Sequence, residues 1–76
     1  METHVLMPHI GGGVTHGRIK KWLAEEGEMV NHYQPLAEVS SEKVSVEIPA
    51  PETGTLHILQ PAGARVAVGA IIATIT

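Results

Sequence analysis

The chain has 76 residues, which suits one domain spanning residues 1–76, and 43% of them are apolar, enough for one thin core. There is no cysteine, which excludes disulfides and thiolate chemistry, and the net charge of −3 argues against a nucleic-acid partner. No apolar run approaches about 18 residues and no basic segment precedes an apolar one near Met1, so we expect neither a membrane span nor a secretory signal. The expected compartment is therefore the cytoplasm, or the mitochondrial matrix in a eukaryote.

Glycines and prolines divide the chain into short runs, a spacing that favours short strands over helices. Residues 18–26 are the exception, because Ile19, Trp22 and Leu23 lie at helical spacing with charged residues between them. Local propensity alone favours a short helix in this segment.

The later segments have clearer strand patterns. Residues 44–48 alternate, with Val44, Val46 and Ile48 on one face. Residues 70–75 are almost continuously apolar, which predicts a strand buried on both sides.

An internal repeat decides the ambiguous segment. Residues 17–27 are similar to residues 54–63 with one residue deleted, and beyond them the copies keep an offset of 36 residues. The matched pairs are Val30 with Val66, Leu36 with Ile72, Ala37 with Ala73, and Val39 with Ile75. Pro61 interrupts the second copy, where Leu56 to Leu59 suit a strand, so the first copy should be a strand too. Two such copies predict a pseudo-symmetric pair that packs together.

The two copies are joined by the turn Ser40-Ser41-Glu42-Lys43. Ser41 to Val44 fit a type I turn, because a serine hydroxyl at its first position can bond to the backbone ahead. Lys43 is then exposed at the tip, and the symmetry places this turn at the opposite end of the domain from the chain termini. A lysine in a turn is usually only solvated, and a protonated amine is no nucleophile, so any modification needs a dedicated enzyme.

Most of the chain, from Val5 to Ile75, resembles the lipoyl domains of 2-oxo acid dehydrogenase complexes. The similarity is carried by several short motifs together. They are Met7-Pro8-His9-Ile10-Gly11, Val14-Thr15-His16-Gly17, Ile19 to Leu23, Glu26-Gly27-Glu28-Met29-Val30, Pro35-Leu36-Ala37-Glu38-Val39, the turn with Lys43, Val46-Glu47-Ile48-Pro49-Ala50-Pro51 and Gly54.

The resemblance implies an all-β fold, a flattened barrel or sandwich of two four-stranded antiparallel sheets related by a pseudo-twofold axis. It implies lipoic acid joined by an amide to Lys43, with Ser41, Glu42 and Val44 as the recognition turn. It further implies structural turn glycines, which are Gly17, Gly27, Gly54, Gly63 and Gly69.

The same resemblance implies a set of partners for a carrier that has no catalytic residues of its own. They are a lipoate ligase or lipoyl transferase, a thiamine-diphosphate-dependent 2-oxo acid dehydrogenase, an acyltransferase catalytic domain with coenzyme A, and dihydrolipoamide dehydrogenase. The lipoyl arm, on the order of 14 Å long by bond lengths, would carry acyl groups and electrons between these active sites.

Three features depart from the family pattern. The usual turn is Asp-Lys followed by a small apolar residue, whereas this chain has Glu42-Lys43-Val44. Gly12 and His16 stand where many relatives carry acids. Tyr33 stands where glycine is common, and its repeat mate is Gly69; a position that needs positive φ would strain a tyrosine by roughly 1–2 kcal/mol.

Other functions fit the sequence less well. A biotinyl domain shares the fold but flanks its lysine with methionines, and the glycine-cleavage carrier protein is normally longer. An unmodified interaction module with Lys43 as a bystander is the alternative of another class. The five histidines lack ligand spacing, so no metal site is predicted, and Gly11 to Gly13 precede no helix start, so a flexible loop is expected rather than a phosphate site. Trp22 is expected to be a core or half-buried anchor.

Overall fold

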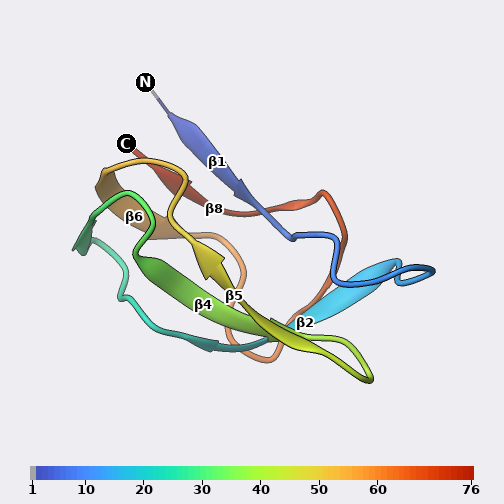
Figure 1. The fold of residues 1–76 in the computed structure, drawn as a ribbon. Helices are drawn as coiled ribbons and strands as arrows, with labels where there is room; N and C mark the ends of the chain where they lie inside the picture. The colour runs from blue at the N-terminus through green and yellow to red at the C-terminus, as the bar shows by residue number, and fades with distance from the viewer. Residues whose placement is uncertain (1) are drawn as a thin grey trace.

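The computed structural model describes residues 2–76, and this range contains eight strands and no helix (Figure 1). The strands are β1 (Thr3–Leu6), β2 (His16–Trp22), β3 (Met29–Val30), β4 (Pro35–Ser40), β5 (Ser45–Pro49), β6 (Gly54–Ile58), β7 (Arg65–Ala67) and β8 (Ile71–Ile75). Within residues 2–76 there is accordingly no helix of the length and apolarity needed to cross a membrane.

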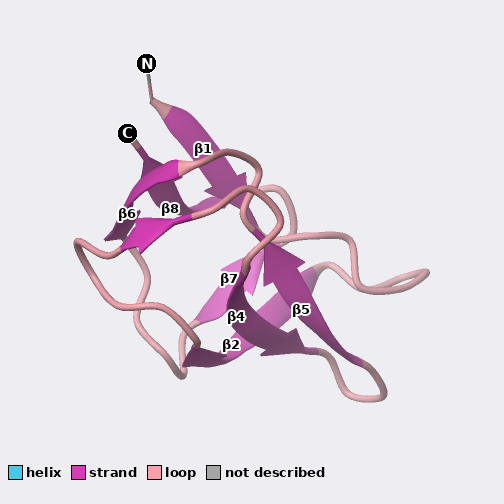
Figure 2. Cartoon of the chain, turned by 60° about the vertical axis from the view of Figure 1, so that its left-hand side comes forward, coloured by secondary structure: helices cyan, strands magenta, loops and turns pink. Residues whose placement is uncertain are grey.

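The strands form two four-stranded antiparallel sheets, which confirms the predicted fold class. One sheet has the order β1-β8-β6-β3 and the other the order β5-β4-β2-β7 (Figure 2). Residues 16–22 form strand β2, so the repeat predicted their conformation correctly where local propensity favoured a helix. A strand there pairs with both β4 and β7, and this backbone pairing outweighs the small difference in propensity.

The hydrogen bonds repeat with the predicted internal symmetry. The Gly27 amide donates to the Leu56 carbonyl at 2.8 Å, and its mate Gly63 donates to the Ile19 carbonyl at 2.6 Å. Likewise, the Tyr33 amide donates to the Ala50 carbonyl at 2.9 Å, and the amide of its repeat mate Gly69 donates to the Met7 carbonyl at the same distance. Each copy therefore completes the other's sheet, because the strands of one half find their partners in the other half.

The residue deleted from the second copy corresponds to a β-bulge in the first. The pairing of β2 with β4 shifts register between Ile19 and Lys21, whereas the equivalent pairing of β6 with β8 runs without interruption. Lys20 is thus the extra residue of the bulge, and it points outward, where its ammonium pairs with the Glu38 carboxylate at 2.9 Å.

Two of the five glycines expected in turns lie in strands instead, which corrects that part of the prediction. Gly17 belongs to β2 and Gly54 opens β6. A Cβ on Gly17 would lie 2.7 Å from Ile10 Cδ1, and one on Gly54 would lie 2.6 Å from the Thr76 carbonyl oxygen. Close packing, and not a turn, therefore favours glycine at these two positions. Gly27, Gly63 and Gly69 do lie in turn regions and have φ values of 80°, 91° and 91°.

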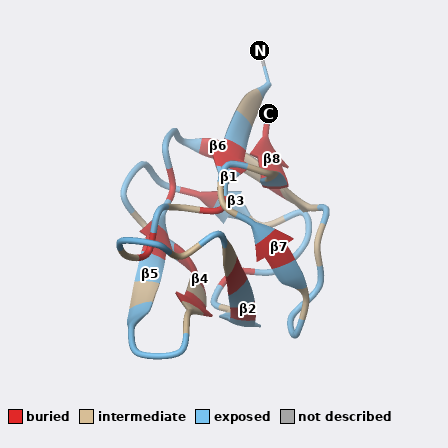
Figure 3. Ribbon diagram, turned by 90° about the vertical axis from the view of Figure 1, so that its right-hand side faces the viewer, coloured by how far each residue is buried: buried red, intermediate tan, exposed pale blue. Residues whose placement is uncertain are grey.

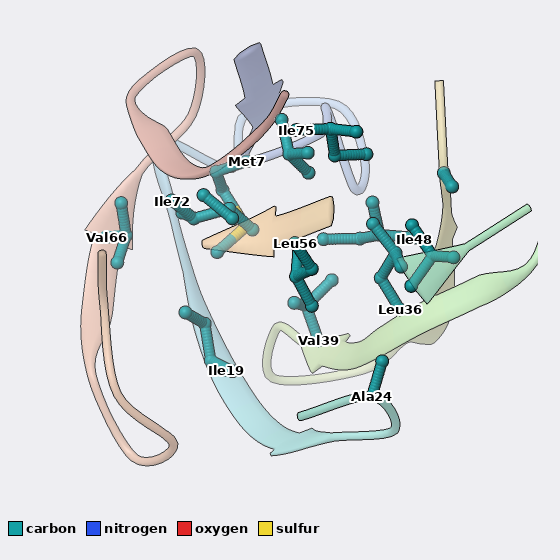
Figure 4. Close-up of a cluster of buried hydrophobic side chains, with 14 of the residues drawn as sticks. Met7, Ile19, Ala24, Leu36, Val39, Ile48, Leu56, Val66, Ile72 and Ile75 are labelled. Atoms are coloured by element: carbon teal, nitrogen blue, oxygen red, sulfur yellow. The ribbon is translucent and has the colours of Figure 1, made fainter. Parts of the chain in front are cut away.

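The core lies between the two sheets and is aliphatic (Figure 4). Its largest fully buried side chains are Met7, Ile19, Leu36, Leu56, Ile72, Ile75, Val5, Val30 and Val39. Strand β8 is buried from Ile72 to Ile75 because it runs between β1 and β6, which confirms most of the predicted buried strand, but Ala70 lies outside it and Ile71 is 38% exposed. Trp22 is half-buried against this core and its indole N–H donates to the Gln60 carbonyl at 2.9 Å, so it is an anchor, as expected.

The turn between β4 and β5 lies at the far end of the domain from the chain termini. Figure 1 shows both termini at one end and this turn at the other, and Figure 3 shows the turn as exposed. The long dimension of the domain is 32 Å against 20 and 19 Å for the other two. A chain continuing from either terminus would therefore start well away from the turn.

Candidate functional site

The candidate site is the β4–β5 hairpin, whose tip holds Lys43. The two strands pair without a register shift from Ala37 and Ile48 to Ser40 and Ser45, and the Ser41 amide then donates to the Val44 carbonyl at 2.8 Å. Tyr33 is the one non-glycine residue with positive φ in the described range, so the tip contains neither a type I′ nor a type II′ turn. The bond between Ser41 and Val44 runs from the amide of the first residue to the carbonyl of the fourth, the reverse of the bond that closes a type I turn, so the type I turn expected from the serine stays a prediction.

The two central residues of the tip, Glu42 and Lys43, are both exposed, and Val44 is 42% exposed. Among residues 2–76 no carboxylate forms an ion pair with Lys43, whereas the ammonium of Lys20 is held by Glu38. The apolar side chains that lead from the tip into β5 become more buried, from Val44 before the strand through Val46 to Ile48. The core thus anchors the hairpin while the lysine amine stays accessible.

An open cleft of about 730 Å³ separates this tip from the loop before β2. One wall is residues 40–44 and the other is residues 10–18, and Arg65 of β7 also lines the cleft. Sequence reasoning missed this cleft and its arginines. Only the pairing of β2 with β7 brings Arg18 and Arg65 together, and nothing in the local sequence signals that pairing.

The triple-glycine segment forms part of the cleft wall as a tight turn. The Val14 amide donates to the Gly11 carbonyl at 3.2 Å, and Gly13 has a φ of 78°. This is the positive φ that a type II turn requires at its third residue. No helix follows the glycines, so the backbone is not arranged as a phosphate-binding loop.

Tyr33 lies outside the cleft and has the backbone conformation that its repeat mate predicts. Its φ is 74° and that of Gly69 is 91°, so the position does require positive φ and the tyrosine is strained. The ring is 74% exposed and stacks on His32 with a centroid distance of 3.8 Å. This exposed stack offsets part of the cost of the strained backbone.

Two carboxyl groups have a lowered pKa. The Ile58 amide donates to Glu26 and lowers its pKa, and His57 at 3.1 Å acts in the same direction. The hydrogen bond from Lys20 lowers the pKa of Glu38. Both carboxylates lie outside the cleft, so they serve the fold and not the tip.

The histidines are spread over the surface. Across residues 2–76 no three side chains of histidine and acidic type gather closely enough to hold a metal ion. His57 binds Glu26 and Thr76, and His16 contacts its neighbour Thr15 at 3.0 Å.

Comparison with known families identifies the domain. The profile of the biotin/lipoyl attachment family, described as "Biotin-requiring enzyme", matches residues 3–75. The chain belongs to the biotin/lipoyl attachment domain family. Of the three lysines in this chain, Lys43 lies on the β4–β5 turn, and Lys20 and Lys21 lie in β2.

Several curated relatives are similar over most of this biotin/lipoyl domain. A lipoamide acyltransferase component of a branched-chain alpha-keto acid dehydrogenase complex from Bacillus subtilis is 43% identical over 91% of the chain. A dihydrolipoyllysine-residue acetyltransferase component of a pyruvate dehydrogenase complex from Corynebacterium glutamicum is 47% identical over 96% of it. A dihydrolipoyllysine-residue succinyltransferase component of a 2-oxoglutarate dehydrogenase complex from Rickettsia bellii is 39% identical over 91% of it.

The chain spans only a small part of these relatives. It covers 16% of the Bacillus protein, 11% of the Corynebacterium protein and 18% of the Rickettsia protein. The similarity therefore concerns the biotin/lipoyl domain and none of the relatives' remaining length.

Proposed function

We propose that this domain is a lipoyl carrier in which Lys43 forms an amide with lipoic acid and shuttles acyl groups within a 2-oxo acid dehydrogenase-type complex. The observation that carries the proposal is the exposed lysine at the hairpin tip, at the opposite end of the domain from the termini. The relatives' names supply the cofactor, since they are lipoamide or dihydrolipoyllysine acyltransferase components.

The tip suits a covalent amide. Lys43 is exposed, and no carboxylate among residues 2–76 competes for its amine, so an attaching enzyme can reach it from several directions. A two-residue tip between paired strands also limits backbone motion at the lysine. When lipoate is bound, its dithiolane supplies redox-coupled acyl transfer, which the side chains of this domain cannot perform.

The protein's own contribution is positioning. The aliphatic core anchors the hairpin, and Ser41, Glu42 and Val44 flank the lysine as the surface that an attaching enzyme meets. Tethering through a chain terminus would raise the effective concentration of the arm at several active sites. The domain is a carrier and contributes no catalytic group of its own.

The proposed partners follow from this role. A lipoate ligase or lipoyl transferase loads Lys43, and a thiamine-diphosphate-dependent dehydrogenase then acylates the arm. An acyltransferase catalytic domain passes the acyl group to coenzyme A, and dihydrolipoamide dehydrogenase reoxidises the dithiol. The complex would lie in the cytoplasm of a bacterium or the mitochondrial matrix of a eukaryote.

A mass measurement tests the proposal. The domain is incubated with lipoate, ATP and a lipoate ligase, and its intact mass and peptide map are recorded. We expect one lipoyl increment on Lys43, lost in Lys43→Ala and retained in Lys21→Ala, which removes another exposed lysine. An unmodified mass with an active ligase would refute the proposal.

The same measurement examines biotinylation. The family includes biotinyl domains, and a biotin ligase with biotin should leave this domain unlabelled because Glu42 and Val44 replace the flanking methionines of that group. Lys43→Ala should remain folded, because an exposed turn substitution changes the free energy of unfolding by less than about 0.5 kcal/mol.

A further inference from the structure

The cleft beside Lys43 is unusually basic for this chain. Three of the five lysines and arginines of the chain line the cleft, namely Lys43, Arg18 and Arg65. Of the eight glutamates, only Glu42 lines it. The chain as a whole has a net charge of −3, so positive charge is concentrated where the arm would be attached. Loss of the Lys43 charge on amide formation still leaves two guanidinium groups facing one carboxylate.

The two arginines are direct cross-strand neighbours. Arg18 of β2 pairs in register with Arg65 of β7, and both side chains point outward because Ile19 and Val66, which follow them, are buried. Like charges in this position repel each other and destabilise the sheet. Among residues 2–76 neither guanidinium has a carboxylate within ion-pair distance. Arg18 is instead held by the Gly63 carbonyl at 3.2 Å, which orients its guanidinium without neutralising it.

The pair also lies within reach of the arm. Arg18 is in register with Ser40, three residues before Lys43, and Arg65 is one strand further. With strands about 5 Å apart and at most about 3.4 Å per residue, both arginines lie roughly 10–15 Å from the lysine backbone. This matches an arm on the order of 14 Å folded back along the cleft.

We propose that Arg18 and Arg65 form a carboxylate-binding subsite for the free end of a dicarboxylic acyl group carried on the arm. The inference rests on the proposed lipoylation of Lys43. A carboxylate between two guanidinium groups relieves their mutual repulsion and accepts charge-assisted hydrogen bonds from both. A simple acetyl or branched alkyl acyl group offers no such partner, so the subsite distinguishes acyl groups by the charge at their far end.

The test places a carboxylate of matched length on the arm and compares it with a neutral group. The chain has no cysteine, so after lipoylation and reduction the arm carries the sample's only thiols. Alkylation with ω-iodobutyrate forms a carbon–sulfur bond, releases iodide and leaves a stable thioether with the length of a succinyl group. Alkylation with ω-iodobutanamide gives the same chain ending in an amide.

The readout is the Nε–H signals of the arginines in nitrogen–proton correlation spectra. We expect the Arg18 and Arg65 signals to shift with the carboxylate arm and not with the amide arm, and the shift to disappear in high salt. Arg18→Gln should reduce the response of Arg65, whereas Lys21→Gln, which removes a positive charge outside the cleft, should leave it unchanged. Equal spectra for the two arms would overturn the proposal.

Two further outcomes are distinguished. If neither arm shifts the arginines but an acidic peptide does, they serve a protein surface and the subsite proposal is wrong. If the mass shows no lipoyl increment, the proposed function fails. The cleft is then tested in the variant Lys43→Cys, whose single thiol is labelled with a maleimide that carries a chain of the arm's length. One label ends in a carboxylate and the other in an amide. Absence of a charge-dependent shift there would overturn the subsite on its own.

Discussion

At the residue scale, Tyr33 is the one non-glycine residue among residues 2–76 with a positive φ, which is 74°. The positive φ raises the free energy of a folded non-glycine residue by roughly 1–2 kcal/mol. Glycine avoids this strain, but it loses more conformational entropy on folding than alanine does, at a cost of about 0.5–1 kcal/mol. The Tyr33 amide donates to the Ala50 carbonyl at 2.9 Å, and a change of side chain preserves this bond. The strain at this position therefore comes from the presence of a Cβ atom and not from the hydrogen bond.

We expect Tyr33→Gly to have a free energy of unfolding about 1 kcal/mol higher than Tyr33→Ala. Alanine keeps the backbone strain and loses the stack on His32, whereas glycine loses both. The difference between the two variants therefore measures the free energy of the backbone strain. Urea denaturation followed by Trp22 fluorescence measures the difference. Equal stabilities of the two variants would show that the turn adapts without strain.

At the scale of the elements, the two strand glycines have different neighbours although they occupy equivalent places in the repeat. A Cβ at position 54 would meet the Thr76 carbonyl oxygen at 2.6 Å, which is backbone, and Ile75 Cγ2 at 2.7 Å. A Cβ at position 17 would meet the ends of two flexible side chains, Ile10 Cδ1 at 2.7 Å and Met7 Sδ at 2.8 Å. Strand β6 therefore has less freedom to adjust than β2.

Gly54→Ala should destabilise the domain by about 1–3 kcal/mol, and Gly17→Ala by less. The expected order follows because side chains can change rotamer, whereas moving Thr76 disturbs its paired hydrogen bonds with Thr55. Thermal unfolding followed by circular dichroism ranks the two variants. A larger loss for Gly17→Ala would contradict the explanation.

The Glu26 carboxylate joins the turn before β3 to strand β6. Its pKa is lowered from 4.5, first by the hydrogen bond from the Ile58 amide, so the ionised form stabilises the folded state. This stabilisation is fully present above pH 4.5 and is lost as the pH falls through the lowered pKa.

We therefore expect wild type to lose stability on acidification below about pH 4.5 more steeply than Glu26→Gln, whose amide cannot ionise. The free energy of unfolding at several pH values measures the slope. Glu38 titrates in the same direction through its bond with Lys20, so the variant should keep part of the acid sensitivity. A variant as acid-sensitive as wild type would contradict the role of Glu26.

At the scale of the whole molecule, stability depends on a core shared by the two halves of the repeat. A chain of this length has a free energy of unfolding of about 4–11 kcal/mol. Leu56 is fully buried in the second copy, and its backbone bonds to Gly27 and Glu28 of the first. Neither half can bury its apolar face alone, so the domain should unfold as one unit.

We expect Leu56→Ala to lose about 2–5 kcal/mol, a large part of the total stability. Leu59→Ala is the matched control, because this leucine is 56% exposed and its truncation should cost far less. Circular dichroism and Trp22 fluorescence should give coincident transitions for both variants. Separate transitions would show that the halves unfold independently.

The sequence by itself determined the strands, their repeat and the lysine turn, because alternation, glycine placement and the offset of 36 residues are local or periodic signals. Tertiary structure decided two things. It made Gly17 and Gly54 packing positions and not turns, and it placed Arg65 beside Arg18. Each depends on which backbone lies next to which, and pairing between residues far apart in the chain is set by the burial of the whole core and not by any local pattern.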